Sequence, residues 1–159
     1  MNYTQCENYR HAIHSWVVDW EWAYPMFVTV TAKQGYKGHY ISDYALQQCV
    51  KHLTKRLEAE FYGSIRRRKG ARLHFLPAGE TSANNRRHFH FIIDNPLGLV
   101  REEYQEEVRT NWKKTDWADR EINVQEYDPD RRHLAYVTKI RTKPEYDLGF
   151  LWDLVRKTI

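Results

Sequence analysis

The sequence predicts an α+β fold, in which an antiparallel sheet of about five strands is covered by helices on one face and a separate helix carries further site residues. Three observations predict this class. Short β-branched or alternating runs recur along the chain, amphipathic stretches of helical period separate them, and a short polar turn joins two of the runs. A turn of that length makes a hairpin, whose two strands are antiparallel.

Four runs have the composition of strands. Each is rich in β-branched or aromatic residues, or alternates apolar with polar side chains, and ends at turn-forming residues. The segment Ser82–Arg86, centred on Asn84 and Asn85, is the expected hairpin turn. The expected strands are Pro25–Lys33, Leu73–Thr81, Arg87–Asn95 and Arg120–Asp128.

Three stretches repeat apolar residues at helical spacing. Ser42 can cap the first, and Pro144 stops the third. The expected helices are 42–62, 100–115 and 130–143, followed by a short apolar closing helix at 150–155. The element order is then β, α, β, β, α, β, α, typical of a ferredoxin-like or RRM-like plan that leaves one face of the sheet free for a site.

Length and charge limit the function classes. With 159 residues the chain fits one domain, 1–159, and its net charge of +4 permits a polyanionic partner without requiring one. Cys6 and Cys49 are far apart and form no C-x-x-C pair, so a disulfide framework is not expected. No apolar run is long enough to span a membrane. These features favour a soluble protein of a reducing intracellular compartment, the cytoplasm if a plasmid or phage encodes it.

The N-terminal segment is rich in tryptophan. Trp16, Trp20 and Trp22 could suggest a membrane anchor, but Asp19 and Glu21 interrupt them. A segment packed on the rest of the domain is therefore favoured.

The sharpest local signal is His88-Phe89-His90 in the third expected strand. Alternate residues of a strand share a face, so the two imidazoles project together while Phe89 points to the core. Rings about 7 Å apart along a strand can converge on one cation. An isolated H-x-H is often only a pair of surface histidines, so the pattern needs a third ligand.

Glu80 is the candidate for that ligand. A hairpin with its tip at Asn84 and Asn85 places Glu80 opposite His88 or His90. Two nitrogens and one oxygen suit catalytic Mg²⁺ or Mn²⁺, and these ligand types also admit Zn²⁺. The structural alternative is a hairpin-edge carboxylate paired with Arg87.

The second signal is Tyr136-Val137-Thr138-Lys139 on the third expected helix. Residues three apart lie on the same side of a helix, so Tyr136 and Lys139 can address one substrate. A phenolate is a feasible nucleophile toward phosphorus when a cation or ammonium lies nearby, and Lys139 could stabilise either the phenolate or the phosphate. The structural alternative is a half-buried aromatic beside a lysine whose ammonium reaches solvent.

Basic side chains provide candidate phosphate contacts. The densest run, between the first helix and the second strand, is expected to be a loop. Most surface arginines are merely solvated, so each assignment is weak by itself. The candidates are Arg66, Arg67, Arg68, Lys69, Arg72, Arg86, Arg87, Arg131, Arg132 and His133.

Taken in order, three motifs resemble those of HUH replication initiators from rolling-circle plasmids, phages and small single-stranded DNA viruses. They are Phe27–Thr31, Gly79–Glu80 together with His88–His90, and Tyr136–Lys139, and the resemblance covers about residues 25–141. The first motif lacks the aromatic ending of many eukaryotic-virus members, so the resemblance is to plasmid or phage members.

The resemblance implies roles for the motif residues. It implies that His88, His90 and Glu80 hold a divalent ion, that Tyr136 attacks single-stranded DNA, and that Lys139 assists. It also implies that the enzyme nicks an origin or hairpin loop, keeps the 5′ end as a phosphotyrosine, and can religate it. A second motif tyrosine is absent, and so is a phosphate-binding G-x-x-x-x-G-K-[ST] run, which implies that any helicase is a separate protein.

Three alternatives remain open. A relaxase or a single-tyrosine transposase uses the same chemistry. A non-catalytic module that stacks single-stranded nucleic acid on exposed aromatics uses the same kind of sheet.

Overall fold

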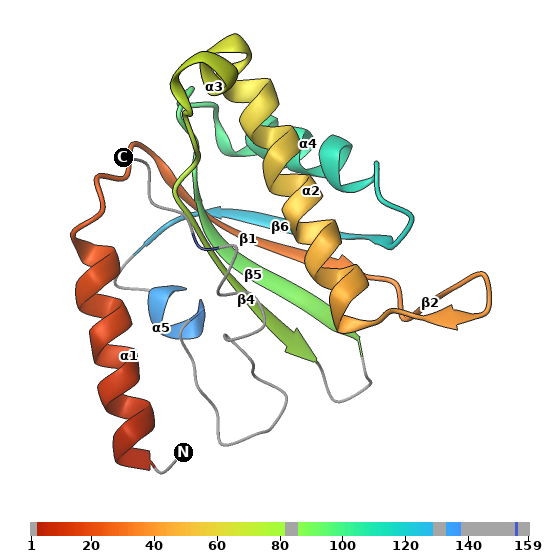
Figure 1. Cartoon of the computed structure of the whole chain (residues 1–159), viewed down its shortest axis with the longest axis horizontal. Coiled ribbons are helices and arrows are strands. Elements are labelled where there is room, and N and C mark those ends of the chain that lie inside the picture. Colours follow the sequence, from red (N-terminus) through yellow and green to blue (C-terminus); the bar gives the residue numbers. More distant parts are fainter. Residues whose placement is uncertain (1–2, 82–85, 129–132, 138–154, 156–159) are drawn as a thin grey trace.

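The computed structural model describes residues 3–81, 86–128, 133–137 and 155 (Figure 1). Among these residues the main sheet has four strands in the order β4-β5-β1-β6, and a separate small sheet pairs two short strands. In chain order the elements are α1 (Tyr3–Val18), β1 (Pro25–Ala32), β2 (Gly35–Tyr36), β3 (His39–Tyr40), α2 (Asp43–Tyr62), α3 (Ser64–Lys69), β4 (Phe75–Thr81), β5 (Arg87–Asp94), α4 (Arg101–Trp112), β6 (Ala118–Glu126) and α5 (His133–Val137).

The main sheet is antiparallel throughout, with β1 in its interior. β1 pairs with β5 on one side and with β6 on the other, and β4 pairs with β5 as the second arm of a hairpin. In that hairpin Glu80 lies opposite His88, as the turn position predicts. The α+β class and the four expected strands are confirmed, whereas a fifth strand of the main sheet is not found among the described residues.

One face of the sheet packs against α2 and α4. Met26, Val28 and Val30 of β1 share a core with Leu53 and Leu57 of α2, all of them buried. The Ser42 side chain accepts a hydrogen bond from the backbone N–H of Ala45 and caps α2, as predicted. Burying each leucine contributes roughly 1.5–3 kcal/mol, so this core holds the sheet against its two helices.

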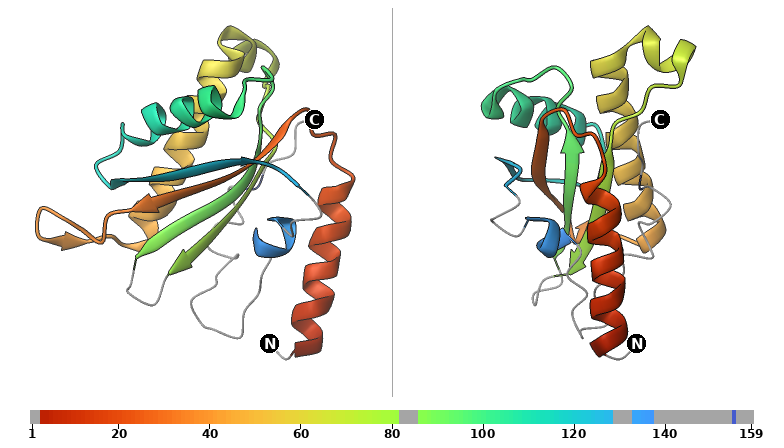
Figure 2. Two further views of the ribbon diagram at one scale, coloured as in Figure 1. Left: turned by 180° about the vertical axis from the view of Figure 1, so that it is seen from behind. Right: turned by 90° about the vertical axis from the view of Figure 1, so that its left-hand side faces the viewer.

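The opposite face carries α1 and α5, seen together in Figure 2. Ile13 and Val17 of α1 and Leu134 and Val137 of α5 are buried in a second core with Phe27 of β1. The expected helices 42–62 and 100–115 lie together on one face, as predicted, and α1 is a further helix that the sequence did not predict. Its apolar residues are too sparse to give a clear helical pattern, and it is held by tertiary packing.

One further expectation changes, and another is only partly tested. Residues 64–69 form the short helix α3 where a loop was expected, and Gly70 ends it in the left-handed region with φ 67°. Of the third expected helix, 130–143, the structure describes α5; its remainder and most of the closing segment 150–155 lie outside the described residues.

The tryptophan-rich segment is packed, as predicted. Trp20 is 3% exposed and its ring stacks on Trp22, with the ring centroids 5.3 Å apart. Within the described part of the chain, no helix has the length and apolar character needed to cross a bilayer.

Candidate functional site

A group of polar side chains lies on the α5-side face of the sheet, toward the hairpin end of β5. We call this group the polar cluster; it consists of Thr29, Thr31, Glu80, His88 and His90. The strand register brings it together, since Thr29 lies opposite His90, Thr31 opposite His88, and Glu80 opposite His88. The other half of the same face is apolar and is covered by α1 and α5. The site is therefore a polar, partly buried area beside an apolar one.

Each histidine ring of the polar cluster is held by a threonine of β1. Thr29 Oγ1 lies 2.9 Å from His90 Nδ1, and Thr31 Oγ1 lies 2.9 Å from His88 Nδ1. When a threonine hydroxyl accepts the Nδ1 proton, Nε2 keeps its lone pair and can bind a cation or accept a proton. β1 thus orients both rings in the same way.

Glu80 completes the polar cluster. Its Oε2 lies 3.2 Å from His90 Nε2, with the side chains of His90 and Glu80 9% and 23% exposed. The His88 and His90 rings are nearly parallel, with their centroids 6.4 Å apart. The strand register thus places one carboxylate and two imidazoles on one face, and the carboxylate contacts His90. Arg87 pairs with Asp43 at 2.8 Å, so the alternative in which Glu80 is its partner is not supported.

Burial favours the neutral form of both imidazoles. It lowers the pKa of His90 from 6.5 to about 4, against the opposing effect of the Glu80 carboxylate. Burial also lowers the pKa of His88, and the Arg86 guanidinium adds to that effect. Neutral imidazole is the form that ligates metal ions.

The donor types of the polar cluster fit a divalent ion. Two neutral imidazoles and one carboxylate are ordinary ligands for such an ion, and the threonines supply the outer hydrogen bonds that orient metal-binding histidines. Glu80 contacts one ring, however, and in the described part of the chain no group of three or more His, Cys, Asp and Glu side chains is arranged to hold a metal. Metal ligation by Glu80, His88 and His90 stays a prediction.

α5 lies next to the polar cluster. Its His133 is 7% exposed, and the ring stacks on Phe27 with the centroids 4.4 Å apart and the planes 4° apart. The backbone N–H of Asp128 donates to His133 Nδ1 at 3.1 Å. A surface phosphate contact requires exposure that His133 does not have, so its expected contact with DNA is not supported by its position.

The predicted nucleophile falls partly outside the described residues. Position 136 belongs to α5, which packs on β4 and β5, the strands that carry Glu80 and the histidines. The Tyr136 side chain is not described, and Lys139, Arg131 and Arg132 lie outside the described residues. The roles predicted for these four residues therefore stay predictions.

The other basic candidates divide between the two ends of the sheet. Arg86 pairs with Asp119 at 3.4 Å and Glu121 at 3.0 Å, close to the hairpin end. Arg66 pairs at 3.2 Å with Glu58, which is fully buried. Figure 1 places α3, which contains Arg66, Arg67, Arg68 and Lys69, at the opposite end of the sheet from the last residues of β4.

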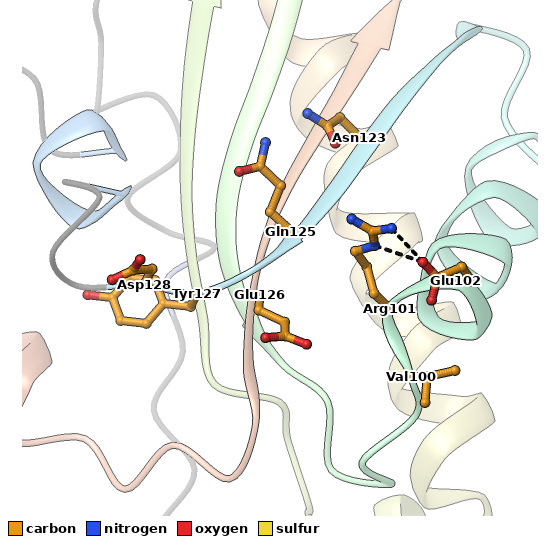
Figure 3. Close-up of a pocket in the computed structure, with 8 residues that line it drawn as sticks. All are labelled: Val100, Arg101, Glu102, Asn123, Gln125, Glu126, Tyr127 and Asp128. Carbon is orange, nitrogen blue, oxygen red and sulfur yellow. Dashed lines mark hydrogen bonds and ion pairs between the residues drawn. The ribbon is translucent and has the colours of Figure 1, made fainter.

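A hollow of about 990 Å³ opens along β6, at the edge of the sheet (Figure 3). Its lining includes Asn123 and Gln125, which lie opposite Thr29 and Phe27 of β1. Sequence reasoning missed the two threonines and these two amides as site residues. Alternation along 120–128 separates the amides from the apolar face, but only the pairing of β1 with both neighbours places them on the face that carries the histidines, one strand away.

Comparison with known protein families gave a match over most of the chain. The model of the replication-associated protein ORF2 family matches residues 25–145. The chain belongs to this family. The match starts at β1 and includes every strand of the main sheet, the polar cluster and Tyr136–Lys139. A search of the curated proteins and a search of the solved structures each gave no match. Membership in the replication-associated protein ORF2 family gives the chain a role in DNA replication, with nucleic acid as its partner.

Proposed function

We propose that this member of the replication-associated protein ORF2 family is a single-tyrosine HUH endonuclease that nicks single-stranded origin DNA and becomes joined to the 5′ end. The observation that carries the proposal is the polar cluster itself. Two threonine-oriented imidazoles lie on the same face of the sheet as a carboxylate and the helix that contains position 136. A purely structural histidine pair needs neither the second threonine nor the carboxylate.

A divalent ion, Mn²⁺ or Mg²⁺, would be held by His88, His90 and Glu80. When bound, it supplies positive charge that stabilises the developing negative charge on a scissile phosphate. Thr29 and Thr31 hold the two rings by Nδ1, so they limit how far the Nε2 atoms can turn. Glu80 is 23% exposed, and a rotation of its side chain from His90 Nε2 would bring its carboxylate toward the ion.

The proposed reaction is a transesterification by Tyr136. The phenol oxygen forms a bond to phosphorus while the bond from phosphorus to the 3′ oxygen breaks. The phenol proton goes to solvent, and the 3′ oxygen leaves as a hydroxyl after taking a proton from solvent. Lys139 is the proposed cation that favours the phenolate, since a nearby positive charge lowers the pKa of a tyrosine. One diester replaces another, so a 3′ hydroxyl can reverse the step without ATP.

The substrate is proposed to be single stranded because in-line attack requires access behind the scissile bond. A stacked and paired duplex blocks that approach, whereas an unpaired strand or a hairpin loop exposes the phosphate. Separation of the duplex is then the task of another protein, the proposed helicase partner.

The test uses a randomised single-stranded oligonucleotide library with Mn²⁺, followed by denaturing electrophoresis. We expect a protein–DNA adduct that survives denaturation and disappears in Tyr136→Phe. Tyr44→Phe is the matched control, because Tyr44 is 71% exposed on α2, across the sheet from the site, and should keep full adduct formation. Reversible binding with no adduct from the wild type would instead indicate a binding module.

A further inference from the structure

We propose that His133 and Phe27 form a positioning pair that sets the orientation of α5 relative to His90 during cleavage. The inference rests on the proposed function, because it concerns how Tyr136 is presented to the scissile phosphate. It assigns His133 to the interior of the protein, as a positioning residue that acts through the helix and makes no contact with DNA.

Three rings connect α5 to the polar cluster. The His133 ring lies on Phe27 with the planes 4° apart, and Phe27 lies beside His90 with the planes 6° apart and the centroids 6.1 Å apart. His90 is in turn fixed by Thr29 and contacts Glu80. A nearly parallel set of rings therefore runs from α5, through Phe27 of β1, to His90 of β5, a proposed metal ligand.

A hydrogen bond fixes the rotation of the His133 ring. Nδ1 accepts the backbone N–H of Asp128 at 3.1 Å, and the Tyr127 ring lies on another side with the centroids 6.0 Å apart. Because Nδ1 is an acceptor, a neutral His133 ring carries its proton on Nε2. The ring thereby joins the end of β6 to α5 as well as joining α5 to β1.

The ring stack gives α5 a directional contact of a kind that apolar packing does not give. Leu134 and Val137 are buried against apolar residues, but apolar contact is non-directional and tolerates small rotations of a helix of five residues. A parallel stack with a hydrogen bond defines both a plane and an angle. Position 136 follows position 133 by three residues, so a rotation of α5 about its axis moves both positions together.

The expected consequence is a loss of rate without a matching loss of affinity. A displacement of about 1 Å in a reacting group can cost roughly 100-fold in rate. His133→Ala should reduce single-turnover cleavage by about 10–100-fold, and the dissociation constant for DNA should change by less than about threefold. Phe27→Leu keeps apolar contact but removes the parallel ring, so it should act in the same direction.

The experiment is a double-mutant cycle. Single-turnover cleavage rates in Mn²⁺ and DNA dissociation constants are measured for the wild type, His133→Ala, Phe27→Leu and the double variant, on one oligonucleotide selected with the wild type. His133→Asn retains an acceptor for the Asp128 N–H and should recover part of the lost rate. Leu76→Val is the matched control, since Leu76 is buried in the same core as α5 and takes no part in the ring stack.

Coupled rate losses in folded variants, with the double variant little worse than either single one, support the pair. Additive losses or unchanged rates would overturn the proposal, and so would a loss of the same size in Leu76→Val. A cleavage rate that falls only in proportion to the folded fraction of each variant, measured by thermal unfolding, would overturn it as well. Failure of the proposed function looks different, because the wild type itself then forms no adduct, and that outcome rejects both ideas.

Discussion

Thr29 Oγ1 lies 2.9 Å from His90 Nδ1, so the interior strand β1 fixes the ring of a histidine on its neighbour β5. The two residues are 61 positions apart, and the sheet alone brings them together. Loss of such an outer hydrogen bond typically costs 10- to 100-fold in metal affinity or activity.

Thr29→Val should therefore raise the Mn²⁺ concentration needed for half-maximal cleavage by about 10–100-fold. Valine has nearly the shape of threonine but has no hydroxyl to orient His90. The measurement is a Mn²⁺ titration of cleavage, with Thr29→Ser as the control that keeps the hydroxyl. An unchanged titration curve in Thr29→Val would show that the hydrogen bond has no part in metal binding.

The variant His90→Ala tests whether His90 acts as a metal ligand or as a contact to DNA. Removal of a ligand should reduce cleavage by more than about 100-fold, because metal stabilisation of charge is worth several kcal/mol. Retention of a single-stranded oligonucleotide on a filter should fall by less than about threefold, since His90 is 7% exposed. An equal loss of cleavage and retention would indicate that the histidines bind DNA directly.

Asp94 makes the stability of the fold depend on pH. It is 4% exposed, and burial raises its pKa from 3.8 to about 6, although the backbone N–H groups of Ala23 and Tyr24 oppose the shift. The folded state therefore binds this proton more tightly than the unfolded chain. Its contribution to stability is complete below pH ~4 and is lost as the pH rises to about 6, by roughly 2–3 kcal/mol.

The free energy of unfolding, measured in urea between pH 4 and 7, checks this sign. The free energy of unfolding of Asp94→Asn should fall less steeply with rising pH than that of the wild type, because asparagine does not titrate. His74 Nε2 lies 4.0 Å from Asp94 Oδ2, so His74→Gln is measured in parallel to separate the two titrations. Identical slopes in the wild type and Asp94→Asn would contradict the prediction.

The amides beside β6 should influence which DNA sequence is cut. Asn123 and Gln125 line the hollow of Figure 3, together with the carboxylates of Glu126 and Asp128, which disfavour a phosphate there. Amide side chains can pair with the edge of a base, and one good pair is worth about 1–3 kcal/mol of discrimination. Gln125→Ala should relax the preferred base at one position near the nick.

Sequencing of the cleaved products from a randomised library measures this preference. Asn123→Ala should relax a preference as well, at the same or a neighbouring position. Arg101→Gln is the control, since Arg101 lines the same hollow but comes from α4 and is paired with Glu102 at 2.5 Å. Identical base preferences in the wild type and both amide variants would show that the hollow takes no part in DNA recognition.

Local patterns predicted much of this fold. α2 is amphipathic and capped by Ser42, as expected. The strand register implied by a turn at Asn84 and Asn85 correctly placed Glu80 opposite the strand that carries the histidines. α1 was missed because its apolar residues are few and become informative only when they meet α5 and the sheet. α3 was missed because four consecutive basic residues give no amphipathic pattern.

The site was predictable only where its partners are close in sequence. Glu80 and His90 are 10 residues apart across one turn, whereas Thr31 reaches His88 over 57 residues. Phe27 and His133 meet because β1 lies between β5 and β6 and because α5 follows β6. Nothing in the local pattern of either residue specifies that contact.

The most direct test of the account is to locate the covalent attachment. The adduct formed with single-stranded DNA and Mn²⁺ is digested with nuclease and protease, and the modified peptide is sequenced by mass spectrometry. We predict a nucleotide joined through its 5′ phosphate to Tyr136. Attachment to a different residue, or a wild-type protein that cleaves without any attachment, would contradict the central claim.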